Sequence, residues 1–138
     1  MSTTIRPSIS ANRKYWISKE RFYELKHFCL QYPEWKKLYF EMSKAEYPSI
    51  TVDSRFGSGV TDKTADIALE LYSLKKKMTM VEEAAKKADV LIYEYIFKAV
   101  TENRSYVYLD TMLHIPCGKD LFYDRYRKFF WLLSSERD

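Results

Sequence analysis

Apolar residues recur at steps of three and four through most of this chain, which is the spacing of one face of an α-helix. A first helix is expected over about residues 18–31, where Ser18 can cap the N-terminus. Pro33 ends this helix or opens the next one, EWKKLYFEM. The apolar faces of these two helices are Phe22, Leu25, Phe28 and Cys29, then Trp35, Leu38 and Met42.

Residues 47–61, YPSITVDSRFGSGVT, interrupt this pattern, because they hold two of the three glycines and have no helical period. We therefore predict a loop or linker there. Thr61 or Asp62 then caps a long helix that ends near residue 88. Its apolar stripe is narrow, as in helices that pack on another helix or on a second subunit. The stripe consists of Ala65, Ala68, Leu71, Tyr72, Met78 and Val81.

Three further helices are predicted after residue 89. Asp89 can cap VLIYEYIFKAVTEN, Ser105 can cap YVYLDTMLH, and the last helix begins near Lys119 and ends near Ser134. The first two are expected to bury Leu91, Ile92, Tyr95, Ile96, Ala99 and Val100, then Val107, Leu109, Met112 and Leu113. The last is expected to bury Phe122, Tyr126, Phe129 and Leu133.

The composition favours an all-α protein, because only three glycines and four prolines interrupt 138 residues. The predicted organisation has a helical N-terminal region, a long connecting helix and a C-terminal helix-turn-helix. Its segments are an arm and helical pair at 1–46, a loop at 47–61, a helix available for homo-oligomer formation at 62–88, and the helix-turn-helix region at 89–138.

The net charge of +4 permits binding to nucleic acid without requiring it. No run of 18 apolar residues occurs, so we expect no membrane span. The N-terminus lacks the apolar core of a signal peptide, which predicts a cytoplasmic protein with reduced thiols.

Motifs of catalysis are missing from the sequence. It contains no phosphate-binding glycine loop, no GxSxG and no HExxH, so we expect neither an enzyme nor a cofactor. His27, Cys29, His114 and Cys117 match a Cys2His2 zinc site in number. However, His27 and Cys29 lie about 200° apart on a helix, so no metal site is predicted. Cys117 has no partnered base and is not predicted to be a nucleophile.

The last two predicted helices are joined by a short turn with Pro116 and Gly118, which is the helix-turn-helix pattern. Such a unit lays its second helix in the DNA major groove. Arginine and lysine there donate to guanine, aspartate accepts from cytosine, and flanking cations contact phosphates. The candidates for base edges are Lys119, Asp120, Tyr123, Asp124 and Arg127, and those for phosphates are Arg125 and Lys128. The alternative is a charged, solvated helix face.

The segments GVTDKTADIALEL and SYVYLDTMLHIPCGKDLFYDRYRKFFWLL resemble the RinA/ArpU-type phage and prophage late-gene transcription regulators of Gram-positive bacteria. The resemblance covers about residues 53–133. It implies a C-terminal region similar to region 4 of sigma factors, with double-stranded DNA and RNA polymerase as partners. It also implies that Ser105 opens the first helix of the DNA reader, and that Lys119, Tyr123, Asp124 and Arg127 belong to the recognition helix.

Two other functions fit the same pattern. A small terminase subunit for DNA packaging is also helical, carries a helix-turn-helix and assembles into rings. A protein-interaction module would instead dock its aromatic last helix on a host factor such as RNA polymerase. The sequence leaves these alternatives open beside the regulator.

Overall fold

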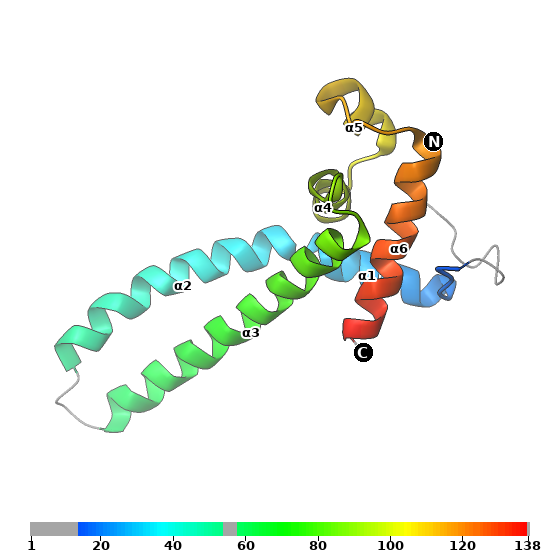
Figure 1. Cartoon of the computed structure of the whole chain (residues 1–138). Coiled ribbons are helices and arrows are strands. Elements are labelled where there is room, and N and C mark those ends of the chain that lie inside the picture. The colour runs from blue at the N-terminus through cyan, green and yellow to red at the C-terminus, as the bar shows by residue number, and fades with distance from the viewer. Residues whose placement is uncertain (1–13, 54–57, 138) are drawn as a thin grey trace. The chain divides into compact units, whose positions relative to one another are not determined.

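In the computed structural model, the described residues, 14–53 and 58–137, form six α-helices and no strand (Figure 1). Side chains are described over residues 14–44 and 63–137. The helices are α1 (Lys19–Leu30), α2 (Tyr32–Asp53), α3 (Ser58–Ala88), α4 (Tyr93–Glu102), α5 (Tyr106–Leu113) and α6 (Lys119–Arg137). The predicted all-α fold is confirmed. None of the described helices has both the length and the apolar character that crossing a membrane requires.

Helix α1 forms as its sequence predicts. The hydroxyl of Ser18 accepts a hydrogen bond of 3.2 Å from the amide of Arg21, which satisfies a donor at the open end of the helix. All four expected apolar residues are buried. The polar arm expected before residue 15 lies mostly outside the described residues.

The prediction of a loop over residues 47–61 is wrong for most of these residues, which are helical. Helix α2 continues to Asp53 and α3 begins at Ser58, upstream of the expected caps. The prediction rested on two glycines and on the missing helical period, but a glycine costs a helix only about 1 kcal/mol. Propagation adds a hydrogen bond for each further residue, and a long helix can therefore continue through such a local penalty. The side chains of Thr61 and Asp62 lie outside the described part.

The chain divides into two compact units. The first contains the described residues up to Gln31 and those from Met80 onward, and the second runs from Tyr32 to Thr79. This division differs from the predicted one, in which residues 89–138 formed a region of their own. The difference arises because α1 contacts both α4 and α6, so the N-terminal helix completes the core of the C-terminal ones.

The core of the first unit lies between α1, α4 and α6, and its α1–α6 contact is aromatic. Phe22 of α1 packs edge-on against Phe130 of α6, with ring centroids 5.0 Å apart, and Phe129 contacts Phe130 in turn. Leu25 of α1 and Ile96 of α4 are fully buried. The predicted inward face of α6 is confirmed, and Phe130 extends it.

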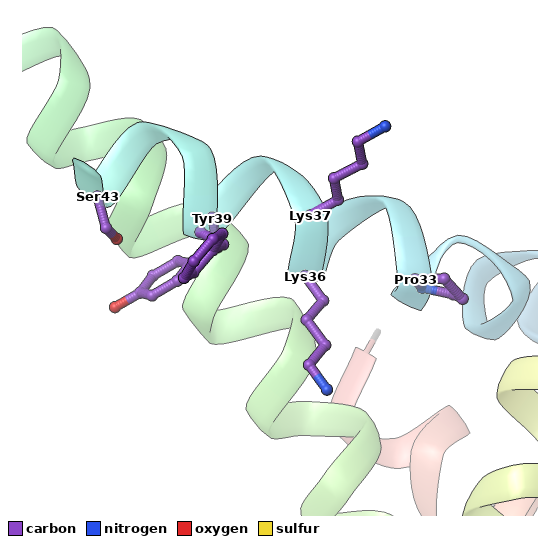
Figure 2. Close-up of a pocket in the computed structure, with 6 residues that line it drawn as sticks. Pro33, Lys36, Lys37, Tyr39 and Ser43 are labelled. Atoms are coloured by element: carbon purple, nitrogen blue, oxygen red, sulfur yellow. The ribbon is translucent and has the colours of Figure 1, made fainter. Parts of the chain in front are cut away.

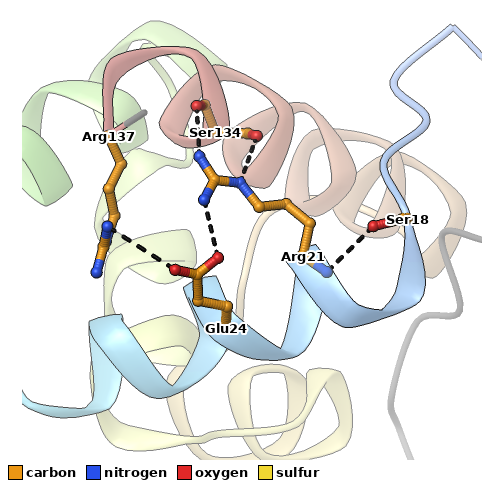
Figure 3. Close-up of polar contacts among 5 residues, drawn as sticks. All are labelled: Ser18, Arg21, Glu24, Ser134 and Arg137. Atoms are coloured by element: carbon orange, nitrogen blue, oxygen red, sulfur yellow. Dashed lines mark hydrogen bonds and ion pairs between the residues drawn. The ribbon is translucent and has the colours of Figure 1, made fainter.

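A polar clamp holds α1 against the C-terminal end of α6 (Figure 3). Nε of Arg21 donates to the hydroxyl of Ser134 at 2.9 Å, and Nη2 donates to the Ser134 carbonyl at 2.8 Å. Nη1 of Arg21 pairs with Glu24 at 2.8 Å, and the other oxygen of Glu24 lies 4.0 Å from Arg137. Because the last carbonyls of a helix have no partner inside it, Arg21 satisfies a group that the helix cannot satisfy itself.

Three residues predicted to face inward are exposed: Leu91, Val107 and Met112 retain 83%, 62% and 63% of their accessible surface. The amides of Leu91 and Ile92 donate to Oδ1 of Asp89, which stabilises a turn there. Helix α4 therefore begins later than expected, and Leu91 lies outside it. Helix α5 has only eight residues and buries Leu109 alone, because one short helix turns a single narrow side to the core.

The second unit consists of two long helices that run antiparallel, α2 and residues 58–79 of α3 (Figure 1). The Nζ atoms of Lys77 and Lys75 lie 5.5 Å and 5.8 Å from the rings of Trp35 and Tyr39, respectively. Two helices shield only one side of each other. In consequence, several residues of the predicted apolar faces are exposed, namely Leu38, Ala65, Ala68 and Tyr72.

Candidate nucleic-acid interface

The corner between α5 and α6 begins with a hydrogen-bonded helix stop. His114 adopts the left-handed conformation, with φ of 56°, and its amide donates to the carbonyl of Asp110 at 3.1 Å. The amide of Ile115 donates to the carbonyl of Leu109 at 3.1 Å, and both side chains are buried. The bond from left-handed His114 to the carbonyl four residues earlier is the αL C-cap motif, and together with the Ile115 bond it satisfies the last carbonyls and fixes the direction in which the chain leaves α5.

The far end of the corner is fixed by Tyr106, the first residue of α5. Its hydroxyl donates to the carbonyl of Cys117 at 2.7 Å. Its ring lies 5.6 Å from that of Phe122 and 6.4 Å from that of Tyr123, centroid to centroid. The first turn of α6 is thus held against the start of α5, so the two helices keep one relative orientation.

Four of the predicted DNA contacts lie on the outward side of α6. At 100° per residue, Asp120, Asp124, Arg127 and Lys128 project away from the buried side that carries Phe122. Asp120 is exposed and the other three are partly exposed. Asp120 also stabilises the helix, because a negative charge in the first turn favours the helix dipole.

Lys119 and Tyr123 flank this outward side. Lys119 is exposed, whereas Tyr123 is half-buried among the rings of Tyr106, Phe122 and Tyr126. Burial raises the pKa of the Tyr123 hydroxyl, so it stays protonated at neutral pH. Tyr123 is therefore better placed to pack in the corner between α5 and α6 than to contact a base.

Arg125, predicted as a phosphate contact, is held by two carboxylates of its own chain. Its Nε lies 3.0 Å from Oδ2 of Asp89, and its Nη1 pairs with Asp124. Partial burial on its own raises the pKa of Asp89, but the amides of Leu91 and Ile92 and the Arg125 guanidinium outweigh it and lower the pKa below its ordinary value. Arg125 thus ties α6 to the turn before α4.

Ser105, the remaining predicted contact, caps α5 and accepts a hydrogen bond of 3.2 Å from the amide of Tyr108. Around it, Lys26 of α1 and Arg104 line a shared small hollow. Arg104 stacks over the ring of Tyr108 at 4.2 Å. The sequence predicted neither Lys26 nor Arg104 as a contact, because no local pattern connects α1 with the start of α5.

The histidines and cysteines do not form a metal site in the part of the chain that the structure describes. His27 and His114 are exposed, whereas Cys29 is fully buried in the core. Burial raises the pKa of both thiols, most strongly that of Cys29, and neither is activated as a thiolate.

A second candidate surface lies along α2 (Figure 2). Lys36 and Lys37 point in different directions from the helix, and Tyr39 projects from the same stretch. The hollow is lined by Pro33, Lys36, Lys37, Tyr39, Phe40 and Ser43. Because all of these residues come from one helix, they form an open flank rather than a site that converges on a ligand.

Comparison of the chain with protein-family models, with curated proteins and with solved structures gave no match.

Proposed function

We propose that this chain is a non-enzymatic DNA-binding protein that places α6 in the major groove of double-stranded DNA. In this proposal it is a transcription regulator of phage or prophage origin, acts in the cytoplasm of a bacterial host, and has RNA polymerase as a second partner. The observation that carries the proposal is the corner between α5 and α6. The αL stop at His114 and the Tyr106 hydrogen bond fix this corner, and Arg127 and Lys128 lie on the outward side of α6.

The chemistry of these residues suits a groove-bound helix. The Arg127 guanidinium can donate two parallel hydrogen bonds to the O6 and N7 atoms of guanine, and Asp120 can accept from the amino group of cytosine. Lys128 can contact a phosphate. Lys26 and Arg104 provide two further cations beside Ser105 at the start of α5, where phosphates of the flanking backbone would lie.

The main test replaces Arg127 with alanine. If α6 reads base edges, Arg127→Ala weakens specific binding by about 1–3 kcal/mol, because the lost contacts pair with one base. Fluorescence anisotropy with genomic DNA fragments measures this loss, and circular dichroism confirms that the variant is folded. Lys36→Ala, which removes an exposed cation of α2, is the matched control and is expected to bind like the parent chain.

Lys128→Ala gives an independent prediction about salt. A phosphate contact contributes about one released counterion, so the variant should bind all sequences more weakly and reduce the slope of log K against log salt by about one. A parent chain without DNA affinity at low salt would contradict the proposal and favour the protein-interaction module. DNA binding by a large ring would instead favour the small terminase subunit.

A further inference from the structure

Most described side chains in the pair of helices α2 and α3 are not buried. Within residues 36–44 and 63–73, where side chains are described, every residue is exposed or half-exposed. The buried residues of the second unit gather at its other end, at Tyr32, Trp35, Leu74 and Met78. A pair of helices that leaves so much apolar surface in water is usually covered by another chain.

One face of α3 has a distinctive order of charges. Ile67, Leu71, Leu74 and Met78 recur at steps of four, three and four and form the more buried side of the helix. The opposite side presents, in order, Asp66, Leu69, Tyr72 and Lys76, all exposed. Leu69 and Tyr72 retain 67% and 66% of their accessible surface. This face therefore has an acid at one end, a base at the other and two large apolar residues between them.

Two copies of this face are complementary when the two helices pack antiparallel. In an antiparallel pair of α3 helices, Leu69 of one copy meets Tyr72 of the other, and the same register brings Asp66 within one residue, about 1.5 Å along the axis, of Lys76. We propose that the chain forms a homodimer in which this face of α3 packs against its own copy about a two-fold axis. The axis passes between Leu69 and Tyr72, so every contact occurs twice, as two-fold symmetry requires.

The charges select this occupant and this orientation. A parallel pair would place Asp66 against Asp66 and Lys76 against Lys76, and such like-charge contacts oppose association. The antiparallel pair makes two opposite-charge contacts while it removes two leucines and two tyrosines from water. The dimer is argued from the α3 face alone and does not rest on DNA binding.

The first experiment is sedimentation velocity of the full chain over a range of concentrations. We expect a species of twice the 16.6 kDa chain mass that dissociates on dilution. Asp66→Lys and Lys76→Asp are each expected to raise the dimer Kd at least about tenfold, because each creates two like-charge contacts. The double variant restores opposite charges and should return to within about threefold of the parent. Glu41→Lys, the same kind of charge reversal on α2, is the control and leaves the dimer intact.

Disulfide capture tests the register in a Cys117→Ser background. A chain with Asp66→Cys mixed with a chain with Lys76→Cys should crosslink on oxidation. Neither chain should crosslink with its own copy, because those positions lie about 13–17 Å apart along the paired helices, beyond the reach of a disulfide. The proposal is overturned if the chain is a monomer at all concentrations or if charge reversal leaves the dimer Kd unchanged. It is also overturned if each chain crosslinks only with its own copy.

Discussion

At the scale of single residues, Asp89 stabilises a turn and does not cap α4 as predicted, because the N-cap of α4 is Ile92. Its Oδ1 accepts the amides of Leu91 and Ile92, while its Oδ2 binds Nε of Arg125 at 3.0 Å. One carboxylate therefore shapes the turn before α4 and joins that turn to α6. The outward side of α6 also carries two other cations, Arg127 and Lys128, together with the carboxylates Asp120 and Asp124.

This carboxylate should make stability depend on pH. Because the folded state lowers the pKa of Asp89, its contribution is complete above about pH 4 and is lost as the pH falls through the folded pKa. Asp89→Asn is expected to cost about 1–3 kcal/mol at neutral pH and less at an acidic pH below about 3. Urea denaturation at both pH values measures the difference. Asp110→Asn, at an exposed carboxylate, is the control, and an equal loss at both pH values would contradict the assignment.

At the scale of elements, two helices end on residues in the left-handed conformation that are not glycine. Asn103 ends α4 with φ of 58°, and His114 ends α5 with φ of 56°. Asparagine tolerates this conformation because its short polar side chain can form a local hydrogen bond. Histidine is larger and is more strained by the steric clash of its Cβ atom. The stop that holds the α5–α6 corner is therefore slightly strained.

Relief of that strain is measurable. His114→Gly should stabilise the protein by about 0.5–1 kcal/mol, because glycine adopts positive φ without a clash. Asn103→Gly should gain less, since asparagine already tolerates the conformation. Chemical denaturation compares the two variants. His114→Ala removes the same exposed side chain and keeps the strain, so a gain there equal to that of glycine would disprove the explanation.

Local patterns predicted the elements better than the candidate site. The capping hydroxyls of Ser18 and Ser105 and the inward face of α6 were all predicted, because caps and helical periodicity are set by neighbours in sequence. The engagement of Arg125 by Asp89 and the position of Lys26 beside Ser105 were not predicted. Both join residues far apart in the chain, and no local pattern records which helices pack together.

At the scale of the molecule, the first unit depends on both ends of the chain. Phe22, Leu25, Phe28 and Cys29 of α1 are buried with the aromatic side of α6, and Arg21 binds Ser134 near its end. The C-terminal helices are therefore not a self-sufficient domain, although their sequence is contiguous.

A fragment of residues 80–138, which keeps the whole C-terminal part of the first unit, should consequently fail to fold cooperatively. Without α1, Tyr126 and Phe130 lose their contacts with Phe22, and the remaining burial no longer offsets the entropy of ordering the chain. Circular dichroism during heating should show a broad, weak transition for the fragment and a sharp one for the full chain. Restoration of the sharp transition by an added peptide of residues 14–31 would assign the loss to α1, and a sharp transition of the fragment alone would contradict it.

The sequence by itself determined that the protein is all-α, where most helices begin, and which side of α6 is apolar, because these depend on spacing and capping within a few residues. Only the tertiary structure decided that α1 completes the C-terminal core and that α2 and α3 form a long pair. The structure alone also decided that Leu91, Val107 and Tyr72 face outward. The physical reason is that burial depends on which surfaces meet, and an apolar side chain looks the same in sequence whether or not a partner covers it.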